Sequence, residues 1–490
     1  MAYQLAKLYA DTIIPSDTPY KLRRLAKYVS TGDLAYALSD DGTYYVCTGI
    51  GTVDDEDIII ADTVNGILVT HIGDSAFYSC TSLKSVTIPD SVSHIGIQAF
   101  INCSNLEDIT IPDSVIDIGN SAFSYCNNLK RITVPAWVIG HILKNNLQTV
   151  VITSGDNISD RAFSSCELLE YVKLCRSITS IGDEAFHWCS KLSSITIPDS
   201  VTSIGNNAFS WCSSLTSITI PDSVTRIGER AFFGCEGLRS VILGTGLSNI
   251  SSGTFSGCQS LANVTIGSNV RDIGISAFAE CYSLESIIIP DGVTSIGENA
   301  FLYCTNLTHI SIPDSVTSVG NSAFLMTDSL EYTERDNAYY LGNDTNPCVI
   351  LMSVKDKSVD SCNIPDGTRV IYDRAFYNYP RLKNLTIPNS VRSIGSWAFY
   401  NCMSLKNVTI PEGVSSIGAG TFDECSGLED VTIPESVTSI GDSAFRYCYN
   451  LTAIHYTGTT EQWESISFGS NWKHESPIDF VICSDGTLPL

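Results

Sequence analysis

A phenylalanine that usually follows an alanine recurs along most of this 490-residue chain. Twelve of the fourteen steps between successive copies are 23 residues long, and the other two are 40 and 52 residues. A fixed period of roughly 20 to 50 residues is typical of stacked repeat architectures, in which each unit contacts only its neighbours. The copies are Phe77, Phe100, Phe123, Phe163, Phe186, Phe209, Phe232, Phe255, Phe278, Phe301, Phe324, Phe376, Phe399, Phe422 and Phe445.

One copy, residues 192–214 (LSSITIPDSVTSIGNNAFSWCSS), predicts one coil of a superhelix. The alternation of apolar and polar residues in LSSITIP predicts a short half-buried strand that ends at Pro198, and Asp199 suits the turn that follows. VTSIG predicts a second brief extended segment. NNAFSWC predicts one or two helical turns with Phe209 and Cys212 facing the core. Because no coil buries its own apolar face, stability has to come from stacked neighbours.

The consensus LxxITIPDSVTSIGxxAFxxC is present from about residue 72 to residue 454 and resembles the BspA-like class of leucine-rich repeats. This resemblance implies an α/β repeat fold, a leucine-rich-repeat solenoid with a parallel β-sheet on one face and short helical turns on the other, capped at both ends. The family is similar to cell-surface and virulence-associated proteins that are linked to adhesion to host proteins or other cells. The resemblance therefore implies a non-catalytic recognition protein.

The pattern divides the chain into four predicted segments. They are a basic N-terminal arm or helix at 1–32, a cap hairpin and degenerate first coil at 33–71, the solenoid at 72–456, and a C-terminal cap at 457–490. The long steps of the repeat predict a shortened coil near 136–153 and a projecting hairpin insertion within 325–375.

Charge and hydropathy limit the partners of the protein. The formal net charge of −25 argues against nucleic acid or an anionic membrane as partner. No apolar run approaches the roughly 18 residues that span a bilayer, so direct membrane insertion is not expected. The N-terminal segment contains no continuous apolar stretch, and no secretory signal peptide is predicted.

Residues 1–29 differ from the rest of the chain in charge. Five basic and two acidic side chains give them a net charge of +3, so the remainder sums to −28. Such asymmetry favours a terminal arm that docks on an acidic surface or assembles copies into a homo-oligomer, and the alternative is a solvated helix face. The candidate anchoring residues are Lys21, Arg23, Arg24 and Lys27.

The cysteines and histidines do not predict a catalytic or metal site. Thirteen of the 18 cysteines lie three residues after the repeat phenylalanine, which predicts a ladder of buried, reduced thiols. His187 lies beside Cys189 in the sequence, but that cysteine belongs to the ladder. Neither GxSxG, HExxH nor a phosphate-loop motif occurs. We therefore predict no catalytic residue, no metal ligands and no cofactor.

Two surfaces could bind a protein or carbohydrate partner. Aromatic residues just after the repeat phenylalanine suggest an exposed stripe, although the rings could instead fill the grooves between coils. The stripe residues are Tyr78, Tyr125, Trp188, Trp211, Phe233, Tyr303, Tyr377, Tyr400 and Tyr447. The second surface is the outward face of the sheet, where the largest side chains at the eighth position after the phenylalanine are Arg131, Tyr171 and His309.

The sequence favours a recognition or adhesion protein that binds through its extended repeat surface. The family resemblance implies a cell-surface or extracellular location. The alternative is a structural appendage, such as a component of a phage or other particle, that is anchored by the N-terminal arm and displays the solenoid.

Overall fold

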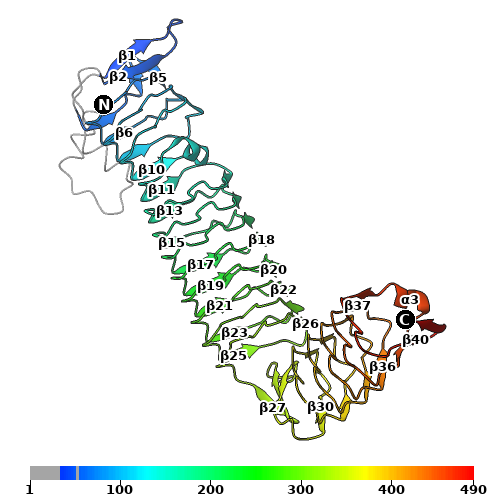
Figure 1. The fold of residues 1–490 in the computed structure, drawn as a ribbon. Helices are drawn as coiled ribbons and strands as arrows, with labels where there is room; N and C mark the ends of the chain where they lie inside the picture. Colours follow the sequence, from blue (N-terminus) through cyan, green and yellow to red (C-terminus); the bar gives the residue numbers. More distant parts are fainter. Residues whose placement is uncertain (1–33, 51–54) are drawn as a thin grey trace. The chain divides into compact units, whose positions relative to one another are not determined.

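The computed structural model describes residues 34–50 and 55–490 (Figure 1). The chain divides into two compact units. The first contains the described residues up to Val201 together with Cys212–Ser214, and the second contains Thr202–Trp211 and Leu215–Leu490. The predicted arm at 1–32, with Lys21, Arg23, Arg24 and Lys27, lies outside the described residues and stays a prediction.

The first unit carries a seven-stranded parallel sheet, here called the long-strand sheet (Figure 1). Neighbouring strands come from successive coils, so that Ser85 lies opposite Asp108 and Arg131 lies opposite Thr149. The strands, in chain order, are β3 (Asp57–Ile59), β6 (Ser85–Thr87), β8 (Asp108–Thr110), β10 (Arg131–Val134), β11 (Thr149–Ile152), β13 (Tyr171–Lys173) and β15 (Ser194–Ile195).

A second row of strands, here called the short-strand sheet, follows the turn after each long strand. In the first unit it begins with an antiparallel hairpin of β1 (Ala35–Leu38) and β2 (Tyr45–Gly49). The remaining strands of the first unit are β4 (Thr63–Val64), β5 (Ile67–Ile72), β7 (His94–Ile95), β9 (Asp117–Ile118), β12 (Asn157–Ile158) and β14 (Ser180–Ile181).

The second unit repeats the same two rows of strands (Figure 1). Its long strands are β17 (Ser217–Ile220), β19 (Ser240–Leu243), β21 (Asn263–Thr265), β23 (Ser286–Ile288), β25 (His309–Ser311), β30 (Ser361–Asn363), β32 (Asn384–Thr386), β34 (Asn407–Thr409), β36 (Asp430–Ile433), β38 (Ala453–Tyr456) and β40 (Phe480–Cys483). Its short strands are β16 (Ser203–Ile204), β18 (Arg226–Ile227), β20 (Asn249–Ile250), β22 (Asp272–Ile273), β24 (Ser295–Ile296), β26 (Ser318–Val319), β31 (Val370–Ile371), β33 (Ser393–Ile394), β35 (Ser416–Ile417), β37 (Ser439–Ile440) and β39 (Ser467–Phe468).

The repeat phenylalanines form a ladder through the core. Neighbouring rings are nearly parallel, with centroids 4.9 to 5.7 Å apart within each run, as offset stacking prefers. The cysteines form a second buried ladder beside the rings. The thiol of Cys103 donates to the carbonyl of Phe77 at 3.1 Å, and Cys258 bonds Phe232 in the same way at 3.2 Å. None of the 18 cysteines forms a disulfide bond.

The segment around each phenylalanine consists of turns and is not helical, which differs from the sequence prediction. In every coil the residues two before and two after the phenylalanine have positive φ, as at Ser75 (53°) and Ser79 (55°). A helix cannot pass through such left-handed positions. The freed amide of Phe77 instead donates to Ala99 of the next coil at 2.7 Å. The predicted solenoid with a parallel sheet is confirmed, and its opposite face is held by bonds between coils.

The two long steps of the repeat interrupt the short-strand sheet. After β10, the 3₁₀ helix η1 (Ala136–His141) begins behind Pro135 and occupies the place of a short strand, so that β9 ends one ladder and β12 begins another. In the second interruption, β27 (Thr333–Arg335), β28 (Ala338–Leu341) and β29 (Ile350–Val354) form an antiparallel meander.

The meander does not project as the sequence suggested. Strand β29 pairs in parallel with β31 and starts a new short-strand ladder. Tyr340 and Leu351 are fully buried in the core of the coils that follow. The insertion therefore serves as the first rung of the next ladder.

The predicted C-terminal cap contains one short α-helix and a terminal hairpin. Helix α3 (Thr460–Glu464) begins at Thr459, which forms a capping box with Gln462. Strand β41 (Gly486–Pro489) pairs antiparallel with β40 and covers the end of the last row of long strands in the second unit. Trp463 is buried against Tyr456, with the ring centroids 5.2 Å apart.

Candidate binding groove

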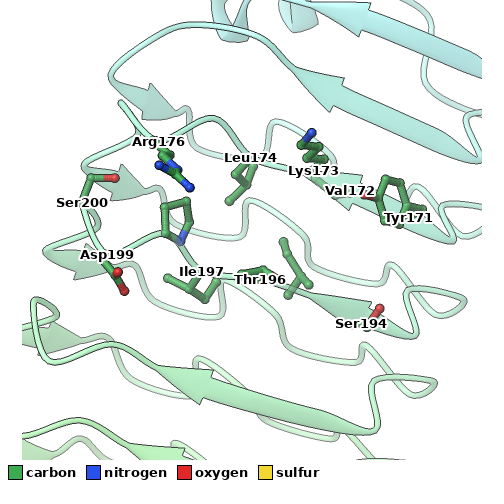
Figure 2. A pocket seen from close by; sticks show the side chains of 12 residues that line it. Tyr171, Val172, Lys173, Leu174, Arg176, Ser194, Thr196, Ile197, Asp199 and Ser200 are labelled. Atoms are coloured by element: carbon green, nitrogen blue, oxygen red, sulfur yellow. The ribbon is translucent and has the colours of Figure 1, made fainter. Parts of the chain in front are cut away.

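A groove of about 770 Å³ opens on the first unit where β13 and β15 lie side by side (Figure 2). The polar side chains that line it come from two successive coils. Four apolar side chains on β13 and β15, or just after these strands, also line the groove, and these four are buried. The polar lining residues are Tyr171, Lys173, Arg176, Ser194, Thr196, Asp199 and Ser200. We call this region the binding groove.

One coil supplies three unusual side chains to the binding groove. In the coil of Phe163, Tyr171 occupies the position that is Ser194 in the next coil, and the two lie opposite each other in the sheet. Lys173 occupies the position of Thr196, and Arg176 that of the turn residue Asp199. Two small hydroxyl residues and one carboxylate of the consensus are therefore replaced by an aromatic ring and two cations.

The scaffold does not require these three residues. Most other coils carry Ser, Asn or Asp at the first position and Thr at the second. At the third position an aspartate can join neighbouring coils: the carboxylate of Asp222 accepts the amide of Thr245 in the next coil at 2.7 Å, which lowers the pKa of Asp222. An arginine cannot accept this bond. Arg176 therefore cannot form the contact that Asp222 makes.

The two cations of the binding groove have no partner among the charged residues that the structure describes. Lys173 and Arg176 are both exposed, and neither lies within 4.0 Å of a described carboxylate. Arg131 on the same sheet differs, because its Nε lies 3.0 Å from Oδ2 of Asp108, whose side chain is only 9% exposed. Tyr171 is 47% exposed and presents its ring to solvent.

A second groove of about 750 Å³ adjoins the first and shares Lys173 with it. It covers β8, β10 and β11 and includes the Arg131 and Asp108 pair. At its edge the hydroxyls of Thr153 and Ser154 both donate to Oδ1 of one aspartate, Asp113, at 2.6 and 2.7 Å. Together the two grooves form one surface of mixed polar and apolar side chains across five neighbouring strands.

The repeat motif that underlies this surface has a known family counterpart. The sequence matches the family described as BspA type leucine rich repeat region (6 copies) over residues 58–154, 142–253, 235–344 and 353–473. These ranges cover well over half of the chain. The chain belongs to the BspA-type leucine-rich repeat family.

Solved structures show similarity along most of this BspA-type chain. A leucine-rich repeat protein from Bacteroides ovatus is 23% identical, with 90% of this chain and 99% of that chain covered and a TM-score of 0.34. A leucine rich cell surface protein from Faecalibacterium prausnitzii is 28% identical, with 90% and 97% covered and a TM-score of 0.25. The pneumococcal vaccine antigen PcpA is 16% identical, with 90% and 100% covered and a TM-score of 0.24. No curated protein matches the chain.

The predicted aromatic stripe is split between two positions of this BspA-type repeat. Tyr78, Phe233, Tyr377 and Tyr400 directly follow the phenylalanine, whereas Tyr125, Trp188, Trp211, Tyr303 and Tyr447 come one residue later, where φ is positive. Aromatic side chains are strained in that left-handed conformation, which glycine and asparagine adopt in several other coils. The aromatic residues therefore do not form one continuous stripe.

The exposure of these rings also differs. Tyr78, Tyr125, Trp188 and Tyr303 are exposed by 59%, 62%, 43% and 42%, respectively. The other five are half-buried. Rings of neighbouring coils pack on each other: Trp211 contacts Phe233 edge to face at 5.4 Å, and Tyr377 stacks on Tyr400 at 4.7 Å. The interpretation as exposed rings thus applies to the first four residues. The interpretation as rings packed between coils applies to Trp211, Phe233, Tyr377 and Tyr400.

His309, the third sheet candidate, belongs to the second unit and does not line the binding groove. Its Nε2 is 3.0 Å from Glu331 and its Nδ1 is 2.8 Å from the hydroxyl of Thr308. Both members of the ion pair are about two-thirds exposed, a setting in which ion pairs contribute little. His309 is therefore a weaker candidate than Tyr171 or Arg131.

The cluster around His187 and Cys189 does not have the properties of a catalytic centre. Cys189 is fully buried, and its thiol donates to the carbonyl of Phe163 at 3.2 Å. Burial raises the pKa of Cys189 well above its usual value, so the reactive thiolate is disfavoured. Within residues 34–50 and 55–490, no three His, Cys, Asp or Glu side chains are grouped as metal ligands would be.

Lys173 and Arg176 were not among the residues predicted from the sequence. The eighth position after each phenylalanine identifies Tyr171 and Arg131 but neither of these cations. A comparison of coils at the tenth and thirteenth positions, where the consensus is Thr and Asp, would have identified both.

Proposed function

We propose that this BspA-type protein is a non-catalytic recognition protein that binds a protein or carbohydrate partner through the binding groove. The observation that carries the proposal is the concentration of Tyr171, Lys173 and Arg176 in one coil, on outward positions where the scaffold favours Ser, Thr and Asp. Aromatic and arginine side chains are the residues that most often carry binding energy at interfaces.

The rigidity of the sheet supports this role. Strand β13 pairs with β11 on one side and with β15 on the other, so the backbone below the three side chains is fixed on both sides. A surface that is already ordered loses little conformational entropy when a partner binds.

A binding panel tests the proposal. Purified protein is applied to immobilised extracellular-matrix proteins and glycans, and retention is compared with that of the triple variant Y171S/K173T/R176D. Because each substitution restores the consensus residue of neighbouring coils, the variant is expected to fold. A matched control, Arg226→Ser, removes a cation from an exposed consensus position of the short strand β18.

The expected result is at least tenfold weaker retention of the triple variant, with the control unchanged. Equal retention of the triple variant and the wild type would show that the partner binds elsewhere.

Display on the cell surface is part of the same proposal, and it rests on the family resemblance. No helix in the described part of the chain has the length and apolar character needed to span a bilayer. Fractionation of a native culture with immunodetection tests the location: the proposal expects the protein on washed cells or in the medium. Recovery with detergent-resistant particles would instead support an appendage anchored through residues 1–32, which no observation on the described residues favours.

A further inference from the structure

The charge of the binding groove is opposite to that of the whole chain. The protein has a net charge of −25, yet the lining of the groove contains Lys173 and Arg176 against the single carboxylate of Asp199. Neither cation forms an ion pair with a described residue, so their charge is available to a partner. Arginine binds carboxylate and sulfate groups through a planar fork of donors, and lysine supplies a point charge.

A bound peptide could not extend the sheet at this place. Peptides that bind a sheet usually add a strand to a free edge. Strands β10, β11 and β13 each pair with a neighbour on both sides, so these three strands offer no free edge to a peptide. A partner that lies over them has to bind through side chains on the outer surface of the sheet.

The outer surface is rich in groups that suit a sugar. The ring of Tyr171 is 47% exposed and offers a flat apolar face, and Ser194 lies opposite it in the sheet. Thr196 adds a second hydroxyl further along the groove. The adjoining groove continues with further threonines, the ion pair of Arg131 and Asp108, and the carboxylates of Asp90 and Asp113, so the positive charge is confined to the binding groove. Together the two grooves span five strands, or about 19 Å at roughly 4.8 Å per strand.

We infer that the binding groove takes an acidic oligosaccharide, whose carboxylate or sulfate group is bound by Lys173 and Arg176 while a sugar ring packs on Tyr171. The inference rests on the proposed function, because it names the class of partner for the same groove. Uronic acids and sulfated sugars share this chemistry, and separate probes distinguish them.

Isothermal titration calorimetry with four probes tests the inference on the full chain. The probes are an oligogalacturonate hexamer as carboxylate source, a heparin-derived hexasaccharide as sulfate source, neutral maltohexaose, and a deca-glutamate peptide. The variants are Lys173→Thr, Arg176→Asp and Tyr171→Ser, each of which restores the residue of a neighbouring coil. Arg226→Ser on β18 is the matched control, since it also restores a consensus serine and removes one positive charge.

The expected result is that at least one acidic hexasaccharide binds and maltohexaose does not. Each of the three groove variants is expected to weaken the binding about tenfold, as the loss of a charged hydrogen bond or a packed aromatic ring does, and the control is expected to leave it unchanged. Binding should also weaken as salt is raised, because salt screens exposed charges.

Other results would overturn the inference. Binding of deca-glutamate with the same dependence on Lys173 and Arg176, while both acidic hexasaccharides fail, would make the partner an acidic peptide. Equal binding of maltohexaose, or an equal loss in Arg226→Ser, would remove the role of the two cations. If no acidic probe binds but the triple variant still loses its partner on the panel, the inference falls and the proposed function stands. If the panel result is also unaffected, both fall.

Discussion

Replacement of Phe255 by alanine tests how the solenoid is held together. The ring is fully buried and stacks on Phe232 and on Phe278, with both centroid separations 5.5 Å. Truncation of a buried phenylalanine typically costs about 3–5 kcal/mol. Each lost ring pair adds about 0.5–1.5 kcal/mol to the area term, so we expect a value in the upper part of that range. Phe255→Leu keeps much of the volume and should cost about 1–2 kcal/mol.

Hydrogen exchange is the appropriate assay, because a long repeat array need not unfold in one step. The amide of Phe232 donates to Thr254 at 2.9 Å, and the amide of Phe255 donates to Ala277 at 2.8 Å, so both report opening of the coils around the ring. A loss of about 3–5 kcal/mol accelerates exchange by about a hundredfold to several thousandfold. Acceleration of less than tenfold in Phe255→Ala would refute the view that the stacked rings stabilise neighbouring coils. Equal effects of the alanine and leucine variants would refute the contribution of the ring volume.

Three further predictions follow from the geometry. Burial raises the pKa of Cys126 to about 12. In the native protein at about pH 8, this thiol should therefore react with iodoacetamide far more slowly than it does in urea. Peptide mass spectrometry measures both rates, and equal rates would contradict its burial. Arg446 binds the buried carboxylate of Asp423 at 2.6 Å. Arg446→Met leaves that carboxylate unpaired and should lower the local free energy of unfolding, measured by hydrogen exchange, by about 3 kcal/mol. An unchanged free energy would show that the pair is dispensable. Desolvation, together with the neighbouring His94, lowers the pKa of His71 below its usual value, so folding favours the neutral ring. As the pH falls from about 7 to about 5, the protection factors of amides around β5 and β7, which are corrected for the slower intrinsic exchange at low pH, should decrease. His71→Asn should remove part of this dependence, and pH-independent protection factors would contradict the prediction.

The parallel ladders could be predicted because each coil carries the same residues at the same spacing. A fixed step of 23 residues places Phe209 on Phe232 and Ser217 beside Ser240 whatever the details of the connecting turns. The side chains at the eighth position could be placed on the outer face for the same reason, since alternation along a strand fixes which residues point outward.

The turns around the phenylalanines could not be predicted with the same success. Left-handed residues usually show themselves as glycine or asparagine, but here the position also carries Trp188, Tyr303 and Glu280. Bonds between coils maintain a conformation that the local sequence disfavours, and a local pattern cannot report such bonds. The meander of β27, β28 and β29 could not be predicted for the same reason. Its pairing with β31 joins segments of different coils, which a local sequence pattern does not report.

The binding groove was only partly visible in the sequence. Tyr171 stood out as a large residue on the sheet, but the groove also depends on the residues two and five positions later, Lys173 and Arg176. Their significance appears once the turn aspartate is seen to accept a bond from the next coil, as Asp222 does. At Arg176 an exposed positive charge therefore stands where an aspartate could bond to the next coil.

The most direct test of the binding groove places the photoreactive residue p-benzoylphenylalanine at position 171 and, as a control, at position 78. Both positions hold exposed tyrosines of the first unit. Tyr171 is on the long-strand sheet, whereas Tyr78 belongs to the turns around the repeat phenylalanines, here called the turn face. After irradiation with the partner identified on the panel, the account predicts a crosslinked adduct from position 171 and none from position 78. An adduct from position 78 alone would place recognition on the turn face and would contradict the account.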